Sequence, residues 1–70
     1  MSKKKRFLHN SVQEKRKQAA LTQVELAERV GVTRQTIISI EKGNYVPSVQ
    51  LALRLASILD ASVEELFYES

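Results

Sequence analysis

Apolar residues between positions 22 and 42 recur with the spacing of two short helices that meet at a glycine. In the first half, three residues fall on one helical face: Leu26, Ala27 and Val30. In the second half, two isoleucines do the same: Ile37 and Ile40. Between them lies Gly31, and glycine readily adopts the positive φ of a tight turn. The pattern predicts two helices packed at a steep angle across this turn.

Both helices have recognisable start signals. Thr22 and Glu25 have the three-residue spacing of a capping box, so the first of the two helices is expected from Thr22 to Val30. Thr33 is suited to cap the next helix, which is expected over residues 34–42 and to end at the glycine that follows. The small side chain of Ala27 suits a close helix crossing.

A further helix is expected before this pair. It starts within residues 7–11 and ends near Ala19. Ser11 and Glu14 have capping-box spacing, and Asn10 is the alternative cap.

Two more helices are expected after the pair. Pro47 prevents a helix from running through, and Ser48 caps the next one over residues 49–59. This helix is apolar around most of its circumference, which indicates burial on more than one side and favours a second copy as the cover. A third capping box opens a short helix over residues 62–67.

The charge is unevenly distributed. Residues 1–17 contain seven basic residues and one acidic residue, whereas residues 48–70 contain one arginine and four acidic residues. The basic end suits a polyanion. We expect residues 1–6 to be a disordered basic arm, either contacting a polyanion or simply solvated, and residues 7–70 to be one domain.

Composition argues against several classes. The chain has no cysteine and one histidine, His9, which we expect to be exposed to solvent. Without paired carboxylates on a cleft, an enzyme is not indicated, and no metal, cofactor or small-molecule ligand is expected. No apolar run reaches the length of a membrane span, and no apolar segment follows the basic N-terminus. A cytoplasmic protein is therefore expected.

The central stretch resembles the helix-turn-helix of the Cro and phage-repressor family, also called the XRE family. The matching positions are Leu26, Ala27, Gly31, Val32, Ile37, Ile40, Glu41-Lys42-Gly43 and Pro47-Ser48. The resemblance implies an all-α, compact five-helix lambda-repressor-like DNA-binding domain of prokaryotic or phage origin. It further implies a transcriptional regulator, with repression the simplest mechanism, that binds a palindromic operator in double-stranded DNA as a homodimer. An antitoxin-like protein-interaction module with autoregulatory DNA binding is the alternative, and a regulatory protein partner is also considered.

The outward face of the second helix of the motif is polar and free of carboxylates, as a phosphate-lined groove requires. By resemblance, five residues read bases: Thr33, Arg34, Gln35, Thr36 and Ser39. Three more hold phosphates: Gln23, Lys42 and Asn44. The basic arm supplies possible further contacts: Lys3, Lys4, Lys5 and Arg6. Ile38 departs from the family, which more often has a polar residue there.

Two structural roles complete the expectations. The resemblance implies an ion pair between Arg16 of the first helix and Glu41 at the end of the third. Three apolar residues in the C-terminal half of the chain are expected to form the dimer interface: Leu53, Phe67 and Tyr68.

Overall fold

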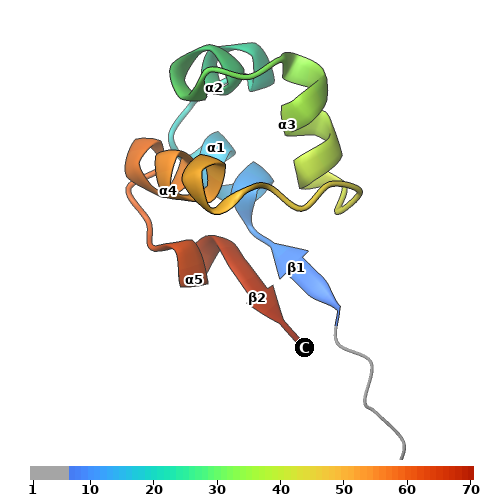
Figure 1. The fold of residues 1–70 in the computed structure, drawn as a ribbon. Helices are drawn as coiled ribbons and strands as arrows, with labels where there is room; N and C mark the ends of the chain where they lie inside the picture. The colour runs from blue at the N-terminus through green and yellow to red at the C-terminus, as the bar shows by residue number, and fades with distance from the viewer. Residues whose placement is uncertain (1–6) are drawn as a thin grey trace, which may run out of the picture.

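The computed structural model describes residues 7–70 as five helices and a two-stranded antiparallel ribbon (Figure 1). The helices are α1 (Val12–Gln18), α2 (Gln23–Val30), α3 (Arg34–Glu41), α4 (Val49–Ile58) and α5 (Val63–Leu66). The strands are β1 (Leu8–Asn10) and β2 (Phe67–Glu69). The predicted all-α, five-helix domain is confirmed, and the ribbon is an addition to it.

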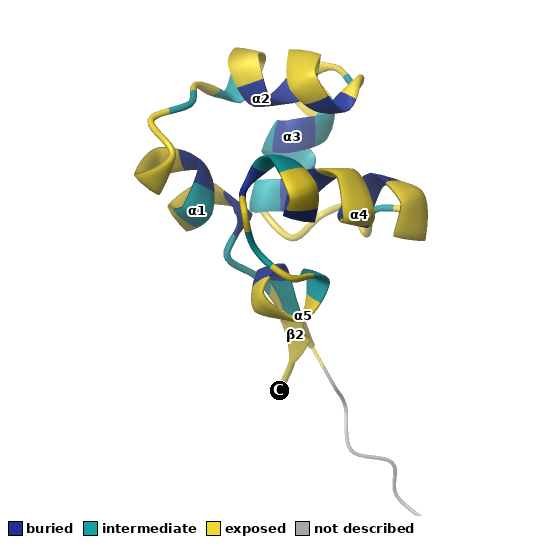
Figure 2. Cartoon of the chain, turned by 90° about the vertical axis from the view of Figure 1, so that its left-hand side faces the viewer, coloured by how far each residue is buried: buried dark blue, intermediate teal, exposed yellow. Residues whose placement is uncertain are grey.

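The core lies between the helices. α2 packs against α3 and α4, α1 against α3, and α4 against α5. The largest fully buried side chains are contributed by all five helices: Val12, Leu26, Val30, Ile37, Ile40, Leu55 and Leu66. Figure 2 shows buried positions of α2, α3 and α4 on their inward faces and exposed positions outside. None of the helices in residues 7–70 is long and apolar enough to cross a membrane.

The turn between α2 and α3 forms as its sequence predicts. Thr22 and Glu25 make the reciprocal capping box at the start of α2. Gly31 ends α2 with φ of +80°, in the left-handed region, and donates its N–H to the carbonyl of Ala27. Thr33 then caps α3 by accepting a hydrogen bond from the amide of Thr36. Local signals therefore set the relative direction of the two helices.

The predicted capping box at Ser11 and Glu14 is wrong. The Ser11 hydroxyl instead donates to the carbonyl of Glu65 across 2.7 Å, which ties the start of α1 to α5. The alternative cap, Asn10, accepts from the amide of Val12 across 3.2 Å. A long-range partner has therefore replaced the local one at Ser11.

The ribbon was not predicted. It pairs Leu8 with Glu69, His9 with Tyr68 and Asn10 with Phe67. For this reason α5 ends at Leu66, one residue earlier than expected, and Phe67 is already extended, with φ of −130° and ψ of 127°. The part of the chain expected to begin the first helix is β1 instead.

Candidate nucleic-acid interface

The outer side of α3 is the polar surface that the sequence predicts. Ile37 and Ile40 are fully buried against the other helices. Arg34 and Gln35, in the first turn, are exposed, and three later positions are half-buried: Thr36, Ile38 and Ser39. The side chains of the first turn are therefore accessible to a groove of nucleic acid.

Hydrogen bonds within α3 hold this surface in one arrangement. The Thr33 hydroxyl accepts from the amide of Thr36 across 3.2 Å, and the two threonine hydroxyls lie 3.1 Å apart. One turn on, the Gln35 amide donates to the Ser39 hydroxyl across 3.4 Å. Glutamine retains a carbonyl and a second N–H after this contact. The predicted base-reading residues thus keep donors and acceptors for base edges.

The only carboxylate of α3 is directed inward. Glu41 has a side chain that is 3% exposed, and its Oε2 lies 2.7 Å from Nε of Arg16. A second contact joins Arg16 Nη2 to Glu41 Oε1 at 3.3 Å, so the pair is bidentate. No negative charge of α3 therefore faces outward to oppose a polyanion.

Two further hydrogen bonds extend this ion pair into a network. Arg16 Nη1 donates to the carbonyl of Leu21 across 2.8 Å, in the connection between α1 and α2. Gln23 Nε2 donates to Glu41 Oε1 across 3.0 Å. The network joins α1, α2 and α3. The contact of Gln23 with Glu41 was missed by sequence reasoning, because no local pattern links positions 18 residues apart.

The residues predicted to hold phosphates gather near the C-terminal end of α3. Gln23 reaches Glu41, the last residue of α3, and Lys42 follows directly as its C-cap. Asn44 lies in the connection to α4, and both Lys42 and Asn44 are exposed. The predicted arm contacts, residues 3–6, lie outside the described residues.

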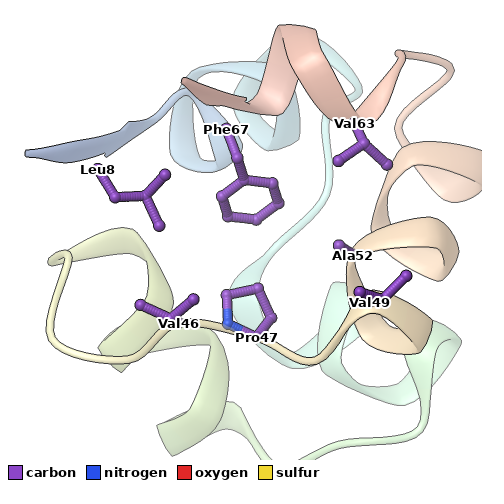
Figure 3. A pocket seen from close by; sticks show the side chains of 7 residues that line it. All are labelled: Leu8, Val46, Pro47, Val49, Ala52, Val63 and Phe67. Carbon is purple, nitrogen blue, oxygen red and sulfur yellow. The ribbon is translucent and has the colours of Figure 1, made fainter. Parts of the chain in front are cut away.

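The residues predicted for the dimer interface lie in α4 and β2. Phe67 is half-buried and lines an apolar groove, whereas exposed Tyr68 stacks on His9 with ring centroids 5.7 Å apart. Leu53 is 57% exposed and lies one helical turn beyond Val49. The groove has a volume of about 240 Å³, and side chains from β1, the α3–α4 connection, α4, α5 and β2 surround it (Figure 3): Leu8, Val46, Pro47, Val49, Ala52, Val63 and Phe67.

α3 follows α2 across a tight turn at Gly31 and presents polar side chains outward, while its only carboxylate, Glu41, is paired with Arg16. This is the arrangement of a helix-turn-helix DNA-binding protein. Within residues 7–70, no three histidine or acidic side chains converge as metal ligands would. The chain belongs to the XRE-type helix-turn-helix family, whose model, described as "Helix-turn-helix", matches residues 12–66. This is a family of DNA-binding transcriptional regulators and not an enzyme class.

Several known proteins are similar to this chain. An uncharacterised HTH-type transcriptional regulator of Methanothermobacter thermautotrophicus is 58% identical over 57 residues, covering 80% of this chain and 83% of its own. The crystal structure of the restriction-modification controller protein C.AhdI of Aeromonas hydrophila is similar, with a TM-score of 0.73 and 34% identity. The match covers 80% of this chain and 85% of C.AhdI. A chain of the SinR protein/SinI protein complex has a TM-score of 0.70 and 33% identity, over 76% of this chain and 52% of its own.

Proposed function

We propose that this protein is a repressor that binds a palindromic operator as a homodimer, with α3 of each protomer in the major groove. The observation that carries this proposal is the outer face of α3, which presents Arg34 and Gln35 while Glu41 is paired internally with Arg16. The simplest mechanism of repression is that the bound protein occludes a promoter.

The chemistry of the α3 side chains supports base reading. Arginine pairs bidentately with guanine, and glutamine pairs bidentately with adenine. Thr36 and Ser39 contribute hydroxyls that donate and accept, and the methyl group of Thr33 suits a thymine methyl. Each good bidentate pair is worth about 1–3 kcal/mol of discrimination against the wrong base.

The apolar groove supports self-association. Val49 is 78% exposed and Val46 is 68% exposed, and together with Phe67 they leave an apolar surface open beside α4 (Figure 3). Covering such side chains stabilises an interface by about 25 cal/mol per Å² of apolar surface removed from water. The groove contains no charged side chain among its lining residues, so a second copy meets no desolvation penalty from a buried ion there.

The position of the groove is the second argument for a dimer. Val46 and Pro47 lie only a few residues after the end of α3. A two-fold contact there brings the C-terminal ends of two α3 helices near the same axis. Dimers of this kind contact half-sites about one helical turn, roughly 34 Å, apart. Two copies would then read a symmetric operator from one side of the duplex.

Selection of bound duplexes from a random pool tests the proposal. The wild-type chain is run beside Gln35→Ala and beside Gln13→Ala, a matched control at an exposed position of α1. We expect a two-fold symmetric site for the wild type and the control, and a site altered at one position per half for Gln35→Ala. An unchanged preference in Gln35→Ala would contradict base reading by α3.

A protein partner is the second candidate, and the similarity to a chain of the SinR protein/SinI protein complex is what favours it. In that case the groove would receive another protein instead of a second copy. Size measurement of the purified chain alone separates the two, because a homodimer forms without a partner.

A further inference from the structure

A polar hollow of about 250 Å³ lies between the ribbon and the C-terminal end of α3. Its polar lining comes from both sides of this junction: His9, Asn10, Glu41, Lys42 and Tyr68. His9 and Tyr68 are paired across the ribbon, and Phe67, the residue before Tyr68, lines the apolar groove. Successive side chains of a strand point to opposite faces. His9 and Tyr68 therefore share one face of the ribbon and Phe67 lies on the other, while Leu8 lines both the groove and the hollow.

Counted with Arg16, the partner of Glu41, the residues that line the hollow carry a net positive charge. Glu41 is neutralised by Arg16 and also accepts from Gln23, so both oxygens of its carboxylate accept hydrogen bonds. Lys42 is exposed and contributes a cation. Glu69 lies directly across from Leu8, which also lines the hollow, so its carboxylate is a further charged group close to His9 and Tyr68. The charged and titratable groups that line the hollow are thus Lys42, His9, Tyr68 and the internally paired Glu41, with Glu69 beside them.

The His9 ring is held in place through one of its two nitrogens. It stacks on Tyr68 with an interplanar angle of 28°, and its Nε2 lies 2.6 Å from the Ser70 hydroxyl. Backbone hydrogen bonds between Phe7 and Ser70, at 3.2 and 3.1 Å, close the ribbon beside it. When Nε2 accepts from Ser70, the neutral ring carries its proton on Nδ1, where it serves as a donor.

The hollow adjoins the predicted phosphate contacts. Lys42 belongs both to its lining and to the end of α3, beside the network that holds Gln23.

We propose that this hollow is an additional phosphate-binding site, in which His9, Tyr68 and Lys42 hold a backbone phosphate of the same DNA duplex that α3 reads. Lys42 supplies the charge, and the His9 ring N–H and the Tyr68 hydroxyl donate hydrogen bonds. The inference rests on the proposed DNA-binding function and adds the ribbon to the interface. It makes DNA affinity depend on a histidine outside the helix-turn-helix.

The test measures affinity for the selected duplex over a salt series. His9→Gln and Tyr68→Phe should weaken binding roughly three- to tenfold, and Lys42→Gln should also lower the slope of log affinity against log salt concentration by about 0.9 for each phosphate that the lysine neutralises. Lys17→Gln, which removes an exposed cation of α1, is the matched control for Lys42→Gln. Circular dichroism melting checks that each variant is folded, and Gln35→Ala is measured in parallel.

Two results would overturn the inference. If His9→Gln and Tyr68→Phe bind as the wild type does while Gln35→Ala still alters sequence preference, the hollow makes no DNA contact although the proposed function stands. If inorganic phosphate perturbs the His9 ring resonances but His9→Gln binds DNA with the affinity of the wild type, the hollow holds a free anion and not the duplex. An unchanged preference in every variant, Gln35→Ala included, would instead remove the proposed function itself.

Discussion

Gln23 donates a hydrogen bond to Glu41 across 3.0 Å, although the two residues belong to different helices of the motif. The same carboxylate receives Arg16 of α1 at 2.7 Å. The buried carboxylate of Glu41 therefore contacts both the cation of Arg16 and Gln23, which is predicted to hold a phosphate. The packing of α1 and the position of a predicted DNA contact are linked through Glu41.

The ion pair should show strong coupling in a double-mutant cycle. Arg16→Met leaves Glu41 without its cation in a site where the carboxylate is 3% exposed, and we expect the free energy of unfolding to fall by about 3–5 kcal/mol. Arg16→Met combined with Glu41→Leu should cost less than the sum of the single changes, because neither charge is then left buried alone. Urea unfolding measures all four proteins. Strictly additive losses would contradict the coupling.

Gln23 and Lys42 should affect DNA binding in different ways. Gln23→Ala removes a neutral donor, so affinity should fall by about 0.5–1.5 kcal/mol for every duplex without a change in salt dependence. Lys42→Ala removes a charge, so the slope of log affinity against log salt should also decrease by about 0.9 for each phosphate that the lysine neutralises. Fluorescence anisotropy over a salt series measures both. Equal slopes for the two variants would argue against a phosphate contact by Lys42.

The apolar groove should control the oligomeric state. Val49→Asp places a charge on the rim of the groove, where covering it would cost the hydration of a carboxylate. We expect the variant to sediment as a monomer under conditions in which the wild type is a dimer. Val24→Asp, at a 46% exposed valine of α2, is the matched control and should leave the dimer intact. Sedimentation equilibrium measures the oligomeric state, and an unaffected dimer in Val49→Asp would show that the groove is not the dimer interface.

Acid should weaken the fold partly through two capping boxes. Hydrogen bonds from the backbone amide and then the hydroxyl of Thr22 lower the pKa of Glu25 below its ordinary 4.5, and Ser62 lowers the pKa of Glu65 in the same way. A carboxyl whose pKa is lower in the folded state stabilises the protein above its unfolded value, and this contribution is lost as pH falls through the folded one.

The melting temperature should therefore decline as pH falls below about 4.5. Glu25→Gln and Glu65→Gln remove the titrating groups while keeping a side-chain acceptor for the N-cap amide. Their melting temperatures should be lower near neutral pH and should decline less steeply in acid. A double variant with the full acid dependence of the wild type would show that other carboxyls are responsible.

Much of the helical framework could be predicted from the sequence because its signals are local. Three of the helices begin with a cap whose hydroxyl accepts a hydrogen bond from the amide three residues later: Thr22, Thr33 and Ser48. Gly31 supplies the left-handed turn. The apolar spacing that placed Ile37 and Ile40 inside also left the first turn of α3 outside, since a helix has a fixed angular period. The polar face of α3 thus followed from composition and period together.

The sequence by itself determined the helices, most of their caps and the face that each turns inward, because these depend on residues three or four positions apart. Only the tertiary structure decided which distant groups meet. It redirected the Ser11 hydroxyl to Glu65, paired β1 with β2 and brought Gln23 to Glu41. It also placed Phe67 and Tyr68, which are neighbours in the sequence, on opposite faces of one ribbon, where Phe67 lines an apolar groove and Tyr68 a polar hollow. Such contacts join positions with no common local period, and they form only when burial of the shared core brings the segments together.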